Sequence, residues 1–206
     1  MRNEKTILIL ATTNSGKIRE ITPMLSDIPL IICSLTQLSG KPEPFTETGK
    51  TFEENAVAKA VYYSKFSDEL VLAEDSGIEV DALDGRPGIY SARYAGKNAT
   101  DEQNNLKLLR ELESAPSEKR NCRYHTVCAL AKHGKIFKIT SGSVNGKVSL
   151  KPAGRGGFGY DPIFFVPEYN KTMAELGSEV KNSISHRYHA VKLMNTKLKK
   201  LLASEI

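Results

Sequence analysis

The spacing of apolar and polar residues predicts helices and strands that alternate along the whole chain. The apolar run Thr6–Ala11 is typical of a buried strand, and a helix follows it from about Ser15, with Pro23 as its kink or end. Apolar residues at helical spacing, each set preceded by a residue able to cap a helix, predict further helices that begin near Thr51, Thr100, Thr172 and Ser185.

The same spacing predicts which faces of these helices are buried. The helix at Thr51 is expected to bury Phe52, Ala56, Val57 and Ala60, while Asn55 and Lys59 share a different face. The helix at Thr100 has a capping box with Gln103, and its buried residues are expected to be Leu106, Leu109 and Leu112.

Strands are predicted mainly in the middle of the chain. Val71–Ala73 has the character of a short buried strand that ends at Glu74 and Asp75, and Asn145-Gly146 indicates a hairpin turn. Further extended segments are predicted at residues 123–131, 136–144 and 163–166. Because no linker or repeat interrupts the alternation, we expect a single mixed α/β (α+β) domain over residues 1–206.

The composition is that of an ordinary folded protein. Hydrophobic residues make up 40% and charged residues 26% of the 206 positions, and the net charge of +5 is compatible with nucleotides or nucleic acid as partners. No apolar run reaches the roughly 18 residues of a membrane span. The lack of such a run predicts no membrane partner. Cys33, Cys122 and Cys128 form no disulfide or metal pattern, which favours a reducing cytoplasm.

The loop Thr12–Lys17 is the first candidate binding segment. It joins a strand to a helix N-terminus, where free amides and the helix dipole favour an anion, and Lys17 adds a full charge. A capped turn with a solvent-exposed lysine is the alternative. Two other glycine motifs do not qualify as phosphate-binding loops. Gly49-Lys50-Thr51 resembles the end of a P-loop, but Pro44 stands where that motif needs its first glycine. Gly154–Gly159 has the spacing of a dinucleotide-binding loop, but it leads into an extended segment rather than a helix.

Acidic and aromatic side chains supply the remaining candidates. Glu47, Glu74 and Asp75 are oxygen ligands of the kind that Mg²⁺ takes together with substrate phosphates, although surface acids at a strand end would give the same pattern. In such a site a metal neutralises phosphate charge and a carboxylate activates water. Phe158, in a flexible glycine-rich loop, offers a face on which a base could stack, unless it enters the core.

Six segments, in order along nearly the whole chain, resemble the inosine/xanthosine triphosphate pyrophosphatase family. They are Thr12–Lys17, Phe52–Ala56 with Lys59, Glu74–Gly77, Gly85–Arg93, Gly156–Pro162 and Ser185–Arg187. Each segment alone is a weak signal, but six in register leave little room for a chance match. The chain differs from many relatives at Thr13, where glycine is common, and at Glu74, where aspartate is common.

The resemblance implies a fold, an activity and partners. The implied fold is a long mixed sheet flanked by helices, in two lobes around a central active-site cleft, and the implied assembly is a homodimer. The implied activity is Mg²⁺-dependent hydrolysis, between the α and β phosphates, of purine nucleoside triphosphates such as ITP, dITP and XTP. Monophosphate and pyrophosphate are the products, and the reaction removes these nucleotides from the nucleotide pool.

The resemblance also assigns roles to residues. Asp75 and Glu47 hold Mg²⁺, and the catalytic set is Asp75, which activates water, with Lys17 and Lys59. The triphosphate pocket is formed by Asn14, Lys17 and Lys59, with Ser76 and the rest of the first loop, Thr12, Thr13, Ser15 and Gly16. The base and sugar are contacted by Phe158, Gly159, Tyr160, Asp161, Lys181, His186 and Arg187.

The two cations assigned to the base suit the expected substrates. Lys181 and Arg187 can only donate hydrogen bonds, so they favour the 6-keto group of hypoxanthine and xanthine over the 6-amino group of adenine. The same donors do not distinguish guanine, which also has a 6-keto group.

Three alternatives belong to other classes or substrates. A nucleic-acid-binding module is motivated by the positive charge and by the segment Arg155–Phe158, but the acids at Glu47, Glu74 and Asp75 oppose it. A pyrophosphatase of methylated pyrimidine triphosphates shares the architecture but not the His186-Arg187 ending. A non-catalytic dimeric scaffold has the least support.

Overall fold

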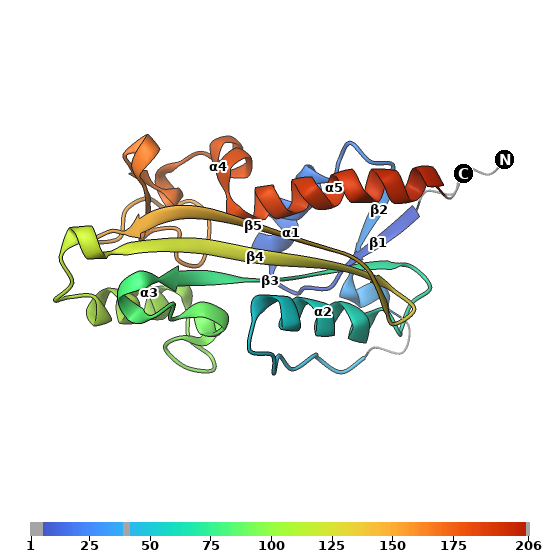
Figure 1. Ribbon diagram of the computed structural model, residues 1–206, viewed down its shortest axis with the longest axis horizontal. Coiled ribbons are helices and arrows are strands. Elements are labelled where there is room, and N and C mark those ends of the chain that lie inside the picture. Colours follow the sequence, from blue (N-terminus) through green and yellow to red (C-terminus); the bar gives the residue numbers. More distant parts are fainter. Residues whose placement is uncertain (1–5, 39–41, 205–206) are drawn as a thin grey trace. The chain divides into compact units, whose positions relative to one another are not determined.

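The chain folds into two compact units, each assembled from segments far apart in the sequence. The computed structural model describes residues 6–38 and 42–204 (Figure 1). Unit 1 comprises Met1–Asp75, Thr126–Gly142 and Arg187–Ile206, and unit 2 comprises Ser76–His125 and Ser143–His186. Within the described ranges, no helix has the length and apolar character needed to cross a membrane. The expectation of one domain over residues 1–206 stays a prediction.

A mixed seven-stranded sheet forms the framework of the described residues. In spatial order its strands are β2 (Leu30–Ser34), β1 (Thr6–Leu10), β3 (Leu70–Val80), β4 (Asn121–Lys132), β5 (Lys135–Val148), β6 (Phe164–Val166) and β7 (Lys171–Thr172). β1 is parallel to β2 and to β3, whereas β6 is antiparallel to β5 and to β7. The predicted mixed α/β class is confirmed.

In unit 1, helices cover both faces of the strands (Figure 1). α5 (His186–Ser204) lies on the opposite side of the strands from α2 (Phe52–Tyr63), and α1 (Ser15–Met24) shares a core with α5. That core joins strand and helix residues, among them Leu8, Leu72, Leu130, Ile21, Val191, Met194 and Leu198. Val191, Met194 and Leu198 of α5 are fully buried in this core, whereas Val57 on α2, which was predicted to be buried, is only half-buried.

The predicted helix starts in unit 1 rest on side-chain caps. Asn14 precedes α1 and its side chain accepts from the backbone N–H of Lys17, while Thr51 precedes α2 and accepts from that of Glu54. Pro23 lies in the last turn of α1, where it ends the helix as predicted.

Unit 2 packs its own core around α3 (Asp101–Glu111), with α4 (Ser178–Ile184) later in the chain. The capping box of Thr100 and Gln103 is present, as predicted. The core includes Ile78, Leu108, Leu112, Tyr124 and Phe164. Arg120 is buried there, and its guanidinium donates to the carbonyl oxygens of Leu112 at 2.7 Å and Val148 at 2.9 Å.

The prediction for the buried face of α3 holds in part. Leu112 is buried and Leu109 is half-buried, as expected, but Leu106 is not. Leu106 is 49% exposed, and the inward side of the helix carries Asn104, Asn105 and Leu108. Asn104 can be buried because it accepts from the backbone N–H of Ala95 at 2.8 Å and donates to a second backbone group, so its polar atoms are satisfied. The spacing of the leucines alone did not indicate that two asparagines also lie on the buried face.

The predicted hairpin turn at Asn145-Gly146 is wrong, because β5 continues through it to Val148. The chain turns earlier, at His133 and Gly134, whose φ angles are 49° and 73°. Gly146 serves a different purpose. A Cβ at this position would lie 2.6 Å from a ring carbon of Phe164 and 2.6 Å from the carbonyl oxygen of Phe165. Only glycine therefore allows β6 to pack this closely.

Candidate active site

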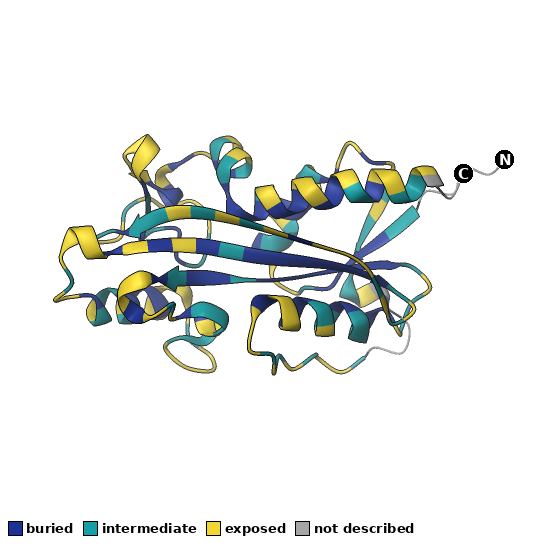
Figure 2. Ribbon diagram, in the orientation of Figure 1, coloured by how far each residue is buried: buried dark blue, intermediate teal, exposed yellow. Residues whose placement is uncertain are grey.

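Glu74 and Asp75 lie in the middle of β3, so the prediction that they end a strand is wrong. They are 2% and 6% exposed, in the buried central part of the strand (Figure 2). Their acidic and glycine-containing neighbourhood has the composition of a turn, but a strand can keep such residues where partners satisfy them. Because successive strand residues point to opposite faces, Glu74 lies on the face shared with Leu72 and Asp75 lies on the face toward α2.

Glu74 is the centre of a buried ion network in unit 1. Its Oε1 accepts from Nη2 of Arg187 at 2.8 Å and from the hydroxyl of Thr126 at 2.6 Å, and its Oε2 pairs with Nζ of Lys17 at 3.1 Å. Arg187 also pairs with Glu20 of α1. Burial by itself raises the pKa of Glu74, but Arg187 and Lys17 outweigh it and hold that pKa well below the usual value.

Asp75 has the opposite electrostatic character. Burial and the negative charge of Glu47 raise the pKa of Asp75, and Lys59 and Lys17 oppose this only in part. The Oδ2 atom of Asp75 accepts from Nδ2 of Asn55 at 3.0 Å. Asp75 is therefore the more basic of the two neighbouring carboxylates and the one better suited to accept a proton from water.

Two lysines approach this pair from different helices. Lys17 belongs to the first turn of α1, and its backbone N–H bonds to the cap residue Asn14 at 3.1 Å. Lys59 of α2 pairs with Glu47 and donates to the backbone oxygen of Glu74 at 3.3 Å. Ammonium groups and helix N-terminal amides beside carboxylates suit a ligand that carries phosphate and a cation together.

The first loop forms the strand-to-helix turn that the sequence predicts. Thr12 is half-buried and its hydroxyl accepts from the backbone N–H of Asn14 at 3.1 Å. Gly16 is buried at the start of α1, whereas Thr13 and Ser15 are exposed. The side chains of Thr12 and Asn14 therefore hold the loop in place. The residues next to the N-terminus of α1 are exposed to solvent.

Glu47 and Asp75 of unit 1 suit Mg²⁺ better than a metal whose ligands must all come from the protein. Glu47 lies near enough to Asp75 for its charge to raise the pKa of that residue, and a cation bound to both would relieve the repulsion. In the part of the chain that the structure describes, no three His, Cys, Asp or Glu side chains gather to hold a metal by themselves. Mg²⁺ characteristically uses one or two carboxylates and completes its shell with water and phosphate oxygens.

In unit 2, the glycine-rich loop brings an aromatic ring and an ion pair together. The carboxylate of Asp161 pairs with Nζ of Lys181 and accepts from the backbone N–H of Phe158 at 2.9 Å. Nζ of Lys181 also lies 4.9 Å from the centre of the Phe158 ring. Gly157 has a φ of 74°, and a Cβ there would lie 1.9 Å from an oxygen of Asp161, so this close turn requires glycine.

The peptide of Gly159 is held from both sides by α3. Its N–H donates to Asp101 at 2.6 Å, and its carbonyl oxygen accepts from Nδ2 of Asn105 at 3.1 Å. The next residue, Tyr160, is buried, and its hydroxyl donates to the backbone oxygen of Ser91 at 2.8 Å. The ring of Tyr160 therefore anchors the loop in the core of unit 2.

Unit 2 also contains His186 and Ser76, two further residues of the predicted site. His186 is buried, and its ring stacks on Tyr124 with ring centres 4.5 Å apart. Tyr124 stacks in turn on Phe164 at the same distance of 4.5 Å. Ser76 is half-buried in β3. The stacking fixes the plane of the His186 ring.

Each unit thus gathers part of the predicted set. Unit 1 brings together Lys17, Glu47, Lys59 and Asp75, and unit 2 brings together Phe158, Asp161 and Lys181. The guanidinium of Arg187, predicted to contact the base, donates to Glu74 and Glu20 here, and its role at the base stays a prediction. Sequence reasoning did not assign roles to the partners that hold these groups, namely Asn55, Thr126, Glu20, Asp101 and Asn105.

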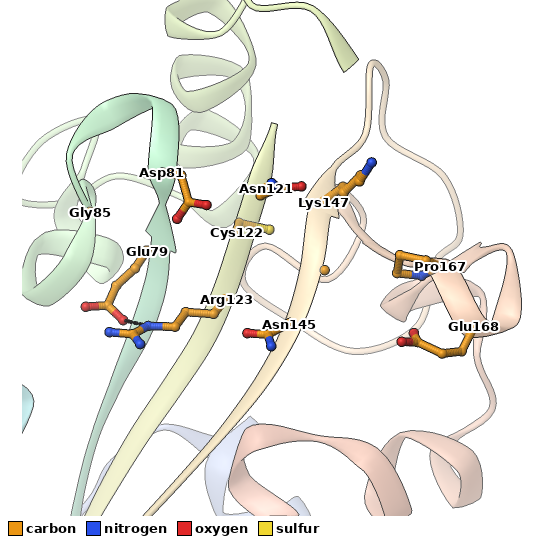
Figure 3. A pocket seen from close by; sticks show the side chains of 11 residues that line it. Glu79, Asp81, Gly85, Asn121, Cys122, Arg123, Asn145, Lys147, Pro167 and Glu168 are labelled. Atoms are coloured by element: carbon orange, nitrogen blue, oxygen red, sulfur yellow. Dashed lines mark hydrogen bonds and ion pairs between the residues drawn. The ribbon is translucent and has the colours of Figure 1, made fainter. Parts of the chain in front are cut away.

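A separate hollow of about 690 Å³ lies in unit 2 and contains no predicted site residue (Figure 3). Its side chains come mainly from β3, β4 and β5. Nε of Arg123 donates there to Glu79 at 2.5 Å. Asp81 directly follows the end of β3, and Lys147 lies near the end of β5. These residues are useful as controls for the predicted site because they carry charge away from it.

Residues 8–197 match the Ham1 family. The chain is 49% identical over 193 residues to a dITP/XTP pyrophosphatase of Geobacter sulfurreducens, covering 94% of this chain and 96% of that protein. It is 48% identical to a dITP/XTP pyrophosphatase of Salmonella paratyphi A, covering 91% and 95%. A solved structure of a HAM1 protein from Coxiella burnetii has a TM-score of 0.86 and 40% identity, covering 95% of this chain and 99% of that one. The chain therefore belongs to the Ham1 family.

Proposed function

We propose that this protein hydrolyses the non-standard purine nucleoside triphosphates ITP, dITP and XTP to the monophosphate and pyrophosphate, and so removes them from the nucleotide pool. The names of its relatives support this activity. The observation that carries the proposal is the group around Asp75, where a buried carboxylate of raised pKa meets Glu47, Lys17 and Lys59. A nucleic-acid-binding role would not require such a carboxylate pair.

Mg²⁺ is the proposed cofactor, held by Asp75 and Glu47. When bound there it would neutralise phosphate charge and make an attached water more acidic. Asp75 accepts the proton of the attacking water, for which its raised pKa suits it. Lys17 and Lys59 bind phosphate oxygens, and the amides of the Thr12–Lys17 loop add neutral donors at the N-terminus of α1.

Recognition of the base is proposed to depend on donors that match a 6-keto group. Lys181 is buried, carries only donors and lies over the ring of Phe158, on which a flat base can stack. His186, Arg187 and the backbone of Gly159 complete the proposed base contacts, and Asp161 holds Lys181 in place. Adenine would leave a buried donor unpaired, and such a mismatch is costly.

Two further parts of the proposal rest on the family resemblance and the composition. The protein is proposed to act as a homodimer and in the cytoplasm, where its cysteines stay reduced. Cys122 and Cys128 are buried, which raises the pKa of both thiols and keeps them unreactive.

A panel of triphosphates tests the proposed function. Pyrophosphate release is measured from ITP, dITP, XTP, GTP, ATP and dTTP, with Mg²⁺ and with a chelator. We expect ITP, dITP and XTP to be hydrolysed far faster than ATP and dTTP, and chelation to stop the reaction. Equal rates on ATP and ITP, or a rate that survives chelation, would contradict the proposal.

Replacing Lys181 with glutamine is expected to weaken selectivity for the base. The amide still donates to Asp161, but it also offers an acceptor to the amino group of adenine. We expect the ratio of kcat/KM for ITP to that for ATP to fall about 10-fold or more, the scale of one hydrogen-bond mismatch. Lys171→Gln, at an exposed lysine of β7 in the same unit, is the control. An unchanged ratio in Lys181→Gln would remove this residue from the base site.

A further inference from the structure

Asn55 makes two hydrogen bonds of opposite direction from one buried side chain. It lies on α2 and is 1% exposed. Its Nδ2 donates to Oδ2 of Asp75 at 3.0 Å, and its Oδ1 accepts from the backbone N–H of Gly49 at 2.8 Å. One amide therefore joins the carboxylate on β3 to the segment that carries Glu47, two residues before Gly49.

The approach of that segment to α2 is close enough to require glycine. A Cβ at Gly49 would lie 2.6 Å from Oδ1 of Asn55 and 2.8 Å from Cβ of Glu54. The following residue, Lys50, is fixed as well, since its backbone N–H donates to the carboxylate of Glu54 at 2.6 Å. The segment is thus tied to the first turn of α2 at consecutive residues.

Only an amide side chain of this length satisfies both partners. A carboxylate at position 55 would place an acceptor against Asp75, and an apolar side chain would leave the N–H of Gly49 without its acceptor. Because the bond from Asn55 fixes Oδ2 of Asp75, it also sets the direction of the other carboxylate oxygen. The relative position of Asp75 and Glu47 therefore depends on Asn55.

We propose that Asn55 is a positioning residue that holds Asp75 and Glu47 in the geometry needed to bind a divalent cation. The residue touches neither nucleotide nor cation in this proposal, and it acts through the two carboxylates. The catalytic consequence rests on the proposed function, but the consequence for cation binding does not, because the cation can be measured without nucleotide.

The test compares Asn55→Ala with Asn104→Ala. Asn104 is 2% exposed on α3, and its amide also makes two hydrogen bonds, accepting from the backbone N–H of Ala95 and donating to the backbone oxygen of Ala92. Each substitution removes from a helix one buried amide that makes two hydrogen bonds, so the two should lower thermal stability to a similar extent. Mn²⁺ is the probe, with binding to the nucleotide-free protein followed by electron paramagnetic resonance.

We expect Asn55→Ala to weaken Mn²⁺ binding and to lower kcat for ITP, each by about 10- to 100-fold, the usual effect of losing a group that orients a metal ligand. KM for ITP should change little, and Asn104→Ala should keep the Mn²⁺ affinity and kcat of the wild type. If Asn55→Ala does not fold, Asn55→Ser is used for the test. Serine is too short to join Gly49 and Asp75, but it leaves a smaller loss of volume than alanine.

A folded Asn55 variant with wild-type Mn²⁺ affinity overturns the proposal, as does an equal loss of affinity in Asn104→Ala. Failure of the proposed function has a different signature. In that case the wild-type protein binds Mn²⁺ and loses it on substitution of Asn55, but does not release pyrophosphate from ITP.

Discussion

Replacing Asp75 with asparagine is expected to lower kcat for ITP by about 10²- to 10⁴-fold in a protein that stays folded. The amide keeps the shape of the side chain but loses the basicity that removes a proton from water and the charge that attracts Mg²⁺. The loss can exceed this range because both contributions disappear together. The measurement is kcat at saturating Mg²⁺, with thermal melting to verify folding.

Asp81→Asn is the matched control for this substitution. Asp81 is exposed, lies outside the predicted site and lines the hollow of Figure 3. Its conversion to asparagine should leave kcat unchanged. A folded Asp75→Asn protein with near-normal turnover would contradict the proposed mechanism. Glu74 is a poor replacement as the base, since Arg187 and Lys17 hold its pKa well below the usual value despite its burial.

The second large effect is expected in stability, at Arg187. Arg187→Met leaves two carboxylates, Glu20 and Glu74, inside unit 1 without the guanidinium that both contact. Removing one partner of a buried ion pair typically costs about 3–5 kcal/mol, because the remaining charge stays buried. For a chain of this size we expect a fall in Tm of about 10 °C.

Lys199→Met is the control for the loss of a cation. Lys199 pairs with Asp27, but the two side chains are 49% and 59% exposed, and such pairs contribute about 0–1 kcal/mol.

The stabilisation that Arg187 provides should also depend on pH. Because the pKa of Glu74 is lowered in the folded protein, its ionised form stabilises the fold above the ordinary value of 4.5, and this contribution is lost as the pH falls toward the folded pKa. Equal Tm values for Arg187→Met and Lys199→Met would contradict this account of the network.

The helix boundaries were predictable because they depend on residues close together in the sequence. Asn14, Thr51 and Thr100 each cap a helix through a backbone N–H three residues later, so the signal lies within one turn. Alternating and helical apolar spacing likewise predicted most elements, since burial of one face is what stabilises them.

The errors arose where distant parts of the chain decide the outcome. Glu74 and Asp75 look like a strand end in the sequence, but Arg187 and Thr126 satisfy the first and Asn55 the second, so β3 continues. Asn145-Gly146 looks like a turn, but the space beside Phe164 is what requires Gly146.

The candidate site shows the same division. The residues expected to touch the substrate, such as Lys17 and Asp75, belong to segments that resemble a known family, so they could be named from the sequence. The residues that orient them could not be assigned this way. Asn55 stands four positions before Lys59 on the same helix, but only the approach of Gly49 and β3 reveals what its amide does.

We propose that the protein cleaves a nucleoside triphosphate between its α and β phosphates. Phosphorus NMR of ITP incubated with the protein and Mg²⁺ follows all products in one experiment. We predict that IMP and pyrophosphate appear in equal amounts, and that Asp75→Asn forms neither at a comparable rate. The appearance of IDP and orthophosphate, or no hydrolysis of ITP by the wild-type protein, would contradict the claim.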